Sequence, residues 1–174
     1  MTILYIVVVL IVIIAILAMI APKTYHVERK ILVKKPVQEV FNYVKFLKKH
    51  DDWSPWSKKD PDMKKEFTGS DGEVGFVSAW EGNRDVGTGE QEIKRIVDNQ
   101  RLETELRFLK PFKSTSDAFI NVKEAEGDST EVTWGFSGKN KFPVSIMMMF
   151  MNMDKTVGKD FEEGLSNMKS QLEG

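Results

Sequence analysis

Trp134-Gly135-Phe136-Ser137-Gly138, together with the segment from Asp154 to Leu172, is the part of the sequence from which the fold can be predicted. In the first stretch Val132, Trp134 and Phe136 share one face, as in the last strand of a half-buried sheet. In the second stretch apolar residues recur at helical spacing, which indicates a long amphipathic helix; they are Val157, Phe161, Leu165, Met168 and Leu172. We therefore expect a helix that lies back across a sheet.

The residues before this pair predict the remaining elements of an α+β domain. Tyr25 to Lys34 alternates like a strand, and Pro36 is well placed to start a helix over residues 37–44. Further strands are predicted at residues 74–81, 90–97, 102–108, 114–124 and 130–137. Turns at short intervals without intervening helices indicate an antiparallel meander.

The first residues have a different character from the rest of the chain. Ile3 to Ala21 contains no charged side chain, and a helix of this length spans about 28 Å, close to the thickness of a bilayer core. A cleaved signal peptide would normally carry a basic start and a small-residue cleavage site, and neither is present here. We therefore expect a membrane anchor in residues 1–22, crossing through residues 3–21, and a folded domain in residues 23–174. The basic residues that follow the span predict a single-pass protein with a cytoplasmic domain; they are Lys23, Arg29, Lys30, Lys34 and Lys35.

Composition argues against several classes of function. The 25 basic and 26 acidic residues give a net charge of −1, which argues against a nucleic-acid binder. The absence of cysteine excludes disulfides and thiolate nucleophiles. His26 and His50 are the only histidines, and His50 is expected to be exposed at a helix end. We expect no metal site, no cofactor and no catalytic residue.

Two apolar segments have more than one interpretation. Trp53 and Trp56 flank a Ser-Pro turn, and they either plug one end of the domain or line the mouth of an apolar pocket. Residues 142–153 are rich in methionine, which indicates adaptable packing or contact with a lipid or membrane surface.

These elements, in this order, resemble the SRPBCC superfamily, which includes START-like domains and the polyketide cyclase/dehydrase and lipid transport group. The resemblance runs from Thr24 to Leu172; its motifs are the strand-Pro-helix opening at 31–43, Trp53-Ser54-Pro55-Trp56, Gly87-x-Gly89, the segment 130–134, and the segment 158–169. It implies a helix-grip fold, in which a curved antiparallel sheet wraps around the last helix and an apolar cavity lies between them. The residues expected on the cavity wall are Trp53, Trp56, Phe76, Trp80, Leu106, Phe108, Phe119, Trp134, Phe136, Phe150 and Phe161. The same residues would equally suit a solid core.

The leading hypothesis is a membrane-anchored, non-catalytic domain that binds a hydrophobic small molecule or lipid. One alternative is a cyclase/dehydrase-like or hydrolytic enzyme acting on an apolar substrate. Another is a protein-interaction module with a solid core. The hydroxyls predicted to face inward, those of Ser78, Thr104 and Ser116, have no base beside them in the sequence pattern and would be poor nucleophiles. The oligomeric state is left open.

Overall fold

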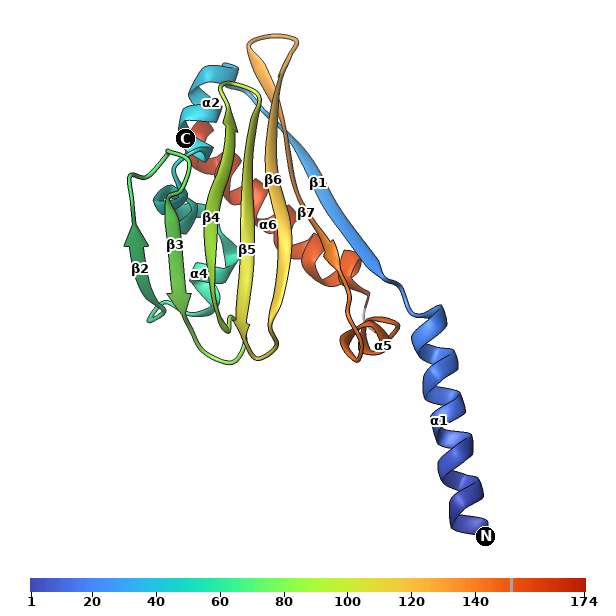
Figure 1. Cartoon of the computed structure of the whole chain (residues 1–174). Coiled ribbons are helices and arrows are strands. Elements are labelled where there is room, and N and C mark those ends of the chain that lie inside the picture. The colour runs from blue at the N-terminus through green and yellow to red at the C-terminus, as the bar shows by residue number, and fades with distance from the viewer. Residues whose placement is uncertain (151) are drawn as a thin grey trace.

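The computed structural model describes residues 1–150 and 152–174, so Met151 of the methionine-rich segment lies outside the described residues. Helix α1 (Thr2–Ile20) projects away from the rest of the chain (Figure 1). It contains no buried residue, and it is long and apolar enough to cross a membrane. Only residues 21–23 separate α1 from strand β1 (Thr24–Val33).

The remaining chain forms one seven-stranded antiparallel sheet in the order β1-β7-β6-β5-β4-β3-β2. The other strands are β2 (Lys64–Thr68), β3 (Val77–Glu81), β4 (Thr88–Val97), β5 (Arg101–Lys110), β6 (Ser114–Ala125) and β7 (Ser129–Lys139). The predicted meander is confirmed, although β3 begins three residues later than expected. Strand β2 was not predicted, because it is an exposed edge strand rich in lysine and shows no alternation of buried and exposed residues.

The helices gather on one face of the sheet, and α6 (Met153–Glu173) crosses that face from end to end (Figure 1). The predicted helix after Pro36 is α2 (Val37–Val44). Four short elements were not predicted: η1 (Leu47–Lys49), α3 (His50–Trp53), α4 (Pro55–Lys59) and α5 (Val144–Met148). Asn152 caps the N-terminus of α6, and its side chain accepts a hydrogen bond of 2.9 Å from the backbone N–H of Lys155.

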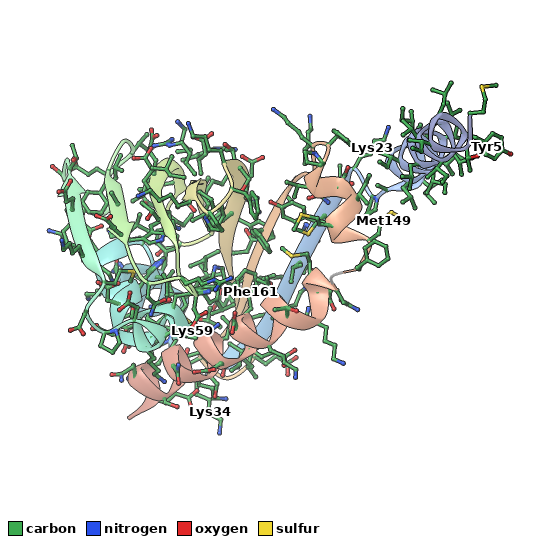
Figure 2. All side chains as sticks on the ribbon, turned by 90° about the horizontal axis from the view of Figure 1, so that it is seen from below. Tyr5, Lys23, Lys34, Lys59, Met149 and Phe161 are labelled. Carbon is green, nitrogen blue, oxygen red and sulfur yellow. The ribbon has the colours of Figure 1, made fainter. Side chains whose placement is uncertain are left out.

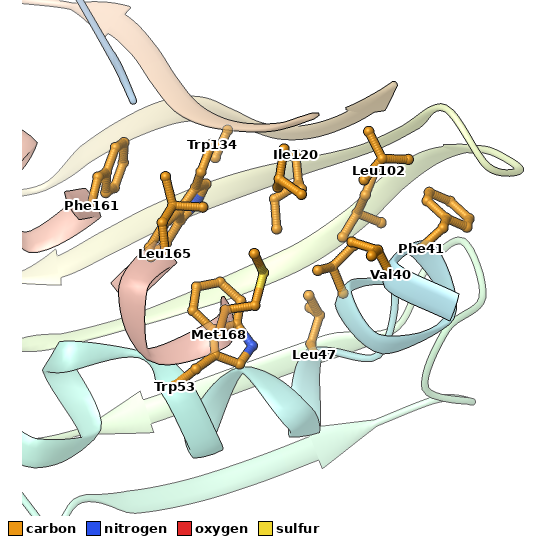
Figure 3. Packing of buried hydrophobic residues seen from close by; sticks show 14 of the residues in the cluster. Val40, Phe41, Leu47, Trp53, Leu102, Ile120, Trp134, Phe161, Leu165 and Met168 are labelled. Carbon is orange, nitrogen blue, oxygen red and sulfur yellow. The ribbon is translucent and has the colours of Figure 1, made fainter. Parts of the chain in front are cut away.

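Between α2 and the C-terminal half of α6 the core is solid (Figure 3). Val40 and Phe41 of α2 and Met168 of α6 are almost completely buried against the sheet. The facing sheet positions carry bulky side chains such as Leu102 and Ile120. Here the side chains fill the layer between helix and sheet, as in other close-packed protein interiors.

Toward the N-terminal half of α6 the same layer is not filled. The strand register places Ala118 beside Phe136, and one step further along it places Ser116 beside Gly138. Ala118 and Ser116 are small inward positions, whereas the Tyr25 ring takes the place that a Gly138 side chain would occupy. Large side chains such as Leu106 and Phe136 stand on the neighbouring strands, and a hollow lies between the sheet and the helices.

Candidate ligand cavity

A cavity of about 960 Å³ occupies this part of the layer between the sheet and the helices. Its walls come from β1 and β3 to β7 on one side and from α3 to α6 on the other. Loops 84–87, 109–115 and 139–141 surround its mouth. The volume falls in the upper part of the range that is usual for small-molecule sites.

Most of the residues that were expected on the wall do line this cavity: Trp56, Trp80, Leu106, Phe108, Trp134, Phe136 and Phe161. The Trp134 ring stacks on Phe161, with ring centroids 4.3 Å apart, and meets Trp56 edge-on at 5.6 Å. Phe161 projects from α6 toward the sheet (Figure 2). The three rings join α4, β7 and α6 into one aromatic wall.

Two expected wall residues belong to the solid core instead. Trp53 is fully buried and packs edge-on against Trp134 at 4.8 Å, but it does not line the cavity. Phe76 is also buried, and its ring stacks on Phe67 at 6.0 Å. The prediction is wrong for both residues, because a core position and a cavity wall require the same aromatic side chain.

Two further expected wall residues lie outside the cavity. Phe119 is on the opposite face of the sheet, where its ring fits over Gly135 on the neighbouring strand and lies under the guanidinium of Arg101 at 4.5 Å. Phe150 is 80% exposed and lines a smaller hollow beside Pro22. Both placements correct the prediction.

The hydroxyls that were expected to face inward are mostly engaged by neighbours. Ser116 is buried, and its Oγ lies 2.5 Å from the hydroxyl of Tyr25, a cavity-lining residue that was not predicted. The side-chain amide of Gln91 donates to Thr104 Oγ1 over 2.9 Å. Ser78 lines the cavity. Burial raises the pKa of the Tyr25 hydroxyl, which therefore stays protonated at neutral pH.

His50 lies on the cavity wall and not at an exposed helix end as expected. Its Nε2 is 2.6 Å from the carbonyl oxygen of Val44, and its ring packs against Trp53 at 4.8 Å. Burial lowers the pKa of His50, and this effect outweighs the opposing hydrogen bond to Val44. The neutral ring donates its Nε2 proton to that carbonyl.

Metal chemistry finds no support in the geometry. Within residues 1–150 and 152–174, no three His, Asp or Glu side chains come together as a metal site would require.

Comparison with known proteins identifies the architecture and nothing more specific. No family model and no curated protein matches the sequence. Among solved structures, a protein from Nitrosospira multiformis is 16% identical with a TM-score of 0.61, over 85% of this chain and 96% of that one. Ara h 8.0201 is 11% identical with a TM-score of 0.53, over 86% of this chain and 97% of that one.

The di-domain ARO/CYC StfQ from the steffimycin biosynthetic pathway is 8% identical, with a TM-score of 0.63 over 87% of this chain and 51% of that one. The chain has a helix-grip fold. At these identities the likeness carries the fold, while the function has to be argued from the site.

Arg29 ties the N-terminal half of α6 to β1 beside the cavity, in addition to the Lys59–Asp160 ion pair and the packing of Phe161. Arg29 of β1 donates to Asp154 at 2.8 Å and to Glu162 at 2.7 Å, two acids on α6 that lie two turns apart. The ion pairs lower the pKa of Asp154. Gly158 lies between these acids, and a Cβ there would collide with the guanidinium. The sequence pattern does not reveal this clamp of Arg29 on Asp154 and Glu162, because Arg29 occupies an inward position of β1 where an apolar residue is the rule.

Proposed function

We propose that this protein is a membrane-anchored domain that binds a hydrophobic small molecule or lipid in the cavity beneath α6. The observation that carries the proposal is the hollow of about 960 Å³ with its largely apolar wall. Apolar ligands are held in such sites mainly by removal of their surface from water, and a few polar groups set their orientation. Tyr25, Gln91 and Ser78 are among the polar residues of the wall that suit that role.

The anchor is assigned to α1. Its 19 residues carry no charge and none of them is buried, so it does not serve as a core helix of this domain. A cleaved signal sequence is the competing interpretation. Retention of α1 in the mature chain, detected by mass spectrometry of the protein from membranes, supports the anchor; a mature chain without it contradicts the anchor.

Ligand binding is tested by a substitution that fills the cavity with a larger side chain. Ala118 lines the cavity, and Ala118→Leu is expected to abolish uptake of a fluorescent fatty acid without loss of stability, because the new side chain enters empty space. Residues 22–174, which contain the whole sheet, core and cavity, are suitable for this assay. Urea denaturation of the same samples measures stability.

The matched control is Ala79→Leu on β3, which makes the same substitution on the opposite face of the sheet. Ala79 is half-buried and does not line the cavity, so uptake is expected to be unchanged. A loss of several kcal/mol in Ala118→Leu would show that the site is already filled, since overpacking a solid core costs about 1–3 kcal/mol. That outcome would favour an interaction module with a solid core.

One observation favours an enzyme as the second candidate. Neutral His50 on the cavity wall uses Nε2 to donate to Val44, which leaves Nδ1 as a potential proton acceptor. Mass spectrometry of bound small molecules distinguishes the two functions. A bound ligand that is recovered with its mass unchanged indicates a carrier. A reaction product that is found with the original chain and not with His50→Gln indicates catalysis.

A further inference from the structure

We propose that the cavity-mouth end of the domain is a docking surface for an anionic lipid bilayer. The proposal rests on the membrane anchor assigned above and adds a second, independent contact between the protein and the membrane. The surface is called the mouth face here, and it consists of the loop 109–113 and the segment 139–150.

Strand register brings these segments to one end of the sheet. Thr24, the first residue after the α1 connection, pairs with Lys139 at the end of β7. The hairpin between β5 and β6 turns at the same end, since Phe108 pairs with Ser114 there. Helix α5 also lies at this end, close to the point where α1 meets β1 (Figure 1).

The mouth face exposes aromatic side chains that a water-soluble surface would rarely display. Phe112 at the hairpin tip is 58% exposed, Phe142 is 63% exposed and Phe150 is 80% exposed. Leu109 and Met147 are exposed beside them. Several large apolar side chains exposed at one end of a domain indicate an interaction surface.

Basic side chains surround these aromatic residues. The exposed lysines of the mouth face are Lys110, Lys113, Lys139 and Lys141, and Lys23 follows the anchor directly. Residues 109–113 and 139–150 contain no aspartate or glutamate, so the charge of the mouth face is positive although the whole chain carries −1. Aromatic residues combined with lysines fit an anionic lipid surface, where the rings enter the interface and the ammonium groups meet the head groups.

The connection to α1 leaves the domain little freedom to turn this face away. Residues 21–23 are the whole connection, and the backbone N–H of Asn140 donates to the carbonyl of Lys23 over 2.9 Å. The Asn140 side chain donates to the carbonyl of Pro22 over 3.1 Å. If α1 spans the bilayer, the mouth face lies at its surface.

A second hollow adjoins the ligand cavity at this surface. It measures about 400 Å³ and is lined by Pro22 and Phe150 on the membrane side. Four residues line both hollows: Tyr25, Asn140, Met148 and Met153. Docking of the mouth face would therefore place an entrance to the cavity against the lipid.

The absence of cysteine allows a direct test on the full chain in lipid nanodiscs. Phe112→Cys and Phe142→Cys each carry a bimane label on the mouth face. Glu126→Cys, in the hairpin between β6 and β7 at the opposite end of the sheet, is the matched control. Nanodiscs contain doxyl-labelled lipid with either phosphatidylcholine alone or about 30% phosphatidylserine.

Docking predicts quenching of the labels at 112 and 142 that is about threefold stronger than at 126 in the anionic nanodiscs. Replacement of Lys110, Lys113, Lys139 and Lys141 by Gln is expected to bring the quenching at 112 and 142 down toward the control value. Quenching no stronger at 112 and 142 than at 126 overturns the docking surface and leaves the anchor and the cavity untouched. Equal quenching in anionic and neutral nanodiscs overturns the role of the lysines.

The same samples separate this inference from the proposed function. A full chain that does not copurify with nanodiscs overturns the anchor, and the docking surface falls with it. Ala118→Leu is expected to keep the quenching pattern while it loses ligand uptake. Loss of both in that variant would mean that docking depends on a bound ligand, which contradicts an independent contact.

Discussion

At the level of single residues, Trp134 and Trp56 separate stability from binding. Trp134 is buried within a cluster that includes Trp53, Trp56 and Phe161, so Trp134→Ala is expected to cost about 3–5 kcal/mol. Trp56 is only half-buried at the cavity wall, and Trp56→Ala should lose less stability but weaken ligand uptake. Urea denaturation and fatty-acid binding measure the two effects. Equal destabilisation with uptake unchanged in Trp56→Ala would contradict its place on the ligand site.

His50 predicts how stability depends on pH. Its pKa is lowered in the folded protein, whereas an unfolded histidine binds a proton near pH 6.5. The unfolded state therefore binds more protons in the window below about pH 6.5, and the free energy of unfolding falls as pH drops through it. The contribution is fully present above that pH. His50→Gln should flatten the dependence between pH 7 and pH 5 in urea titrations.

The control for this measurement is His26→Gln. His26 is exposed on the outer face, where its ring stacks on Phe119 at 6.1 Å. This variant is expected to keep the steep pH dependence of the original chain. A flattening in His26→Gln equal to that in His50→Gln would show that the dependence does not originate on the cavity wall.

At the level of elements, the clamp on α6 makes an unusual prediction for Gly158. Replacing glycine by alanine inside a helix normally stabilises a protein by about 1 kcal/mol. Here the added methyl group would displace the Arg29 guanidinium from Asp154 and Glu162, so Gly158→Ala is expected to destabilise the domain. In an Arg29→Ala background the conflict is gone, and the same substitution should become stabilising.

A double-mutant cycle by thermal denaturation measures this change of sign. Hydrogen exchange adds the location, because loss of the clamp should speed exchange at residues 153–160 more than at 165–172. Lys155→Gln removes a neighbouring charge that does not contact Arg29 and serves as the control. The clamp is refuted if Gly158→Ala stabilises both backgrounds by the same amount.

The elements also show which parts of the fold the sequence predicts. Strands β5 and β7 and helix α6 place their apolar residues at strand or helix spacing in the sequence, and their positions were predicted to within one or two residues. The sequence pattern did not predict strand β2, because neither of its faces is buried. The face of Phe119 was ambiguous, since its neighbours Ala118 and Ile120 are also apolar. Only the pairing of Phe119 with Gly135 shows which way it points.

At the level of the whole molecule, the cavity could not be predicted from composition. An aromatic residue suits a filled core and a cavity wall equally well. Trp53 and Trp134 are in contact, yet Trp53 belongs to the filled core and Trp134 lines the cavity. The informative residues are the small ones: Ala118 lines the cavity from the inward face of β6, and Gly138 makes room for the Tyr25 ring on the cavity wall. Recognising them requires the strand register, which a single sequence does not give. His50 and Arg29 were missed for a similar reason, because their partners lie in other elements.

The three residues between α1 and β1 also set a limit on range. An extended chain covers at most about 3.6 Å per residue, so this tether allows the domain to move roughly 10 Å from the end of a spanning helix. A domain held so closely cannot shuttle cargo across the gap between two separate membranes. If α1 is the proposed anchor, any hydrophobic cargo would have to be taken from, and returned to, the bilayer that α1 spans or an acceptor that comes to its surface.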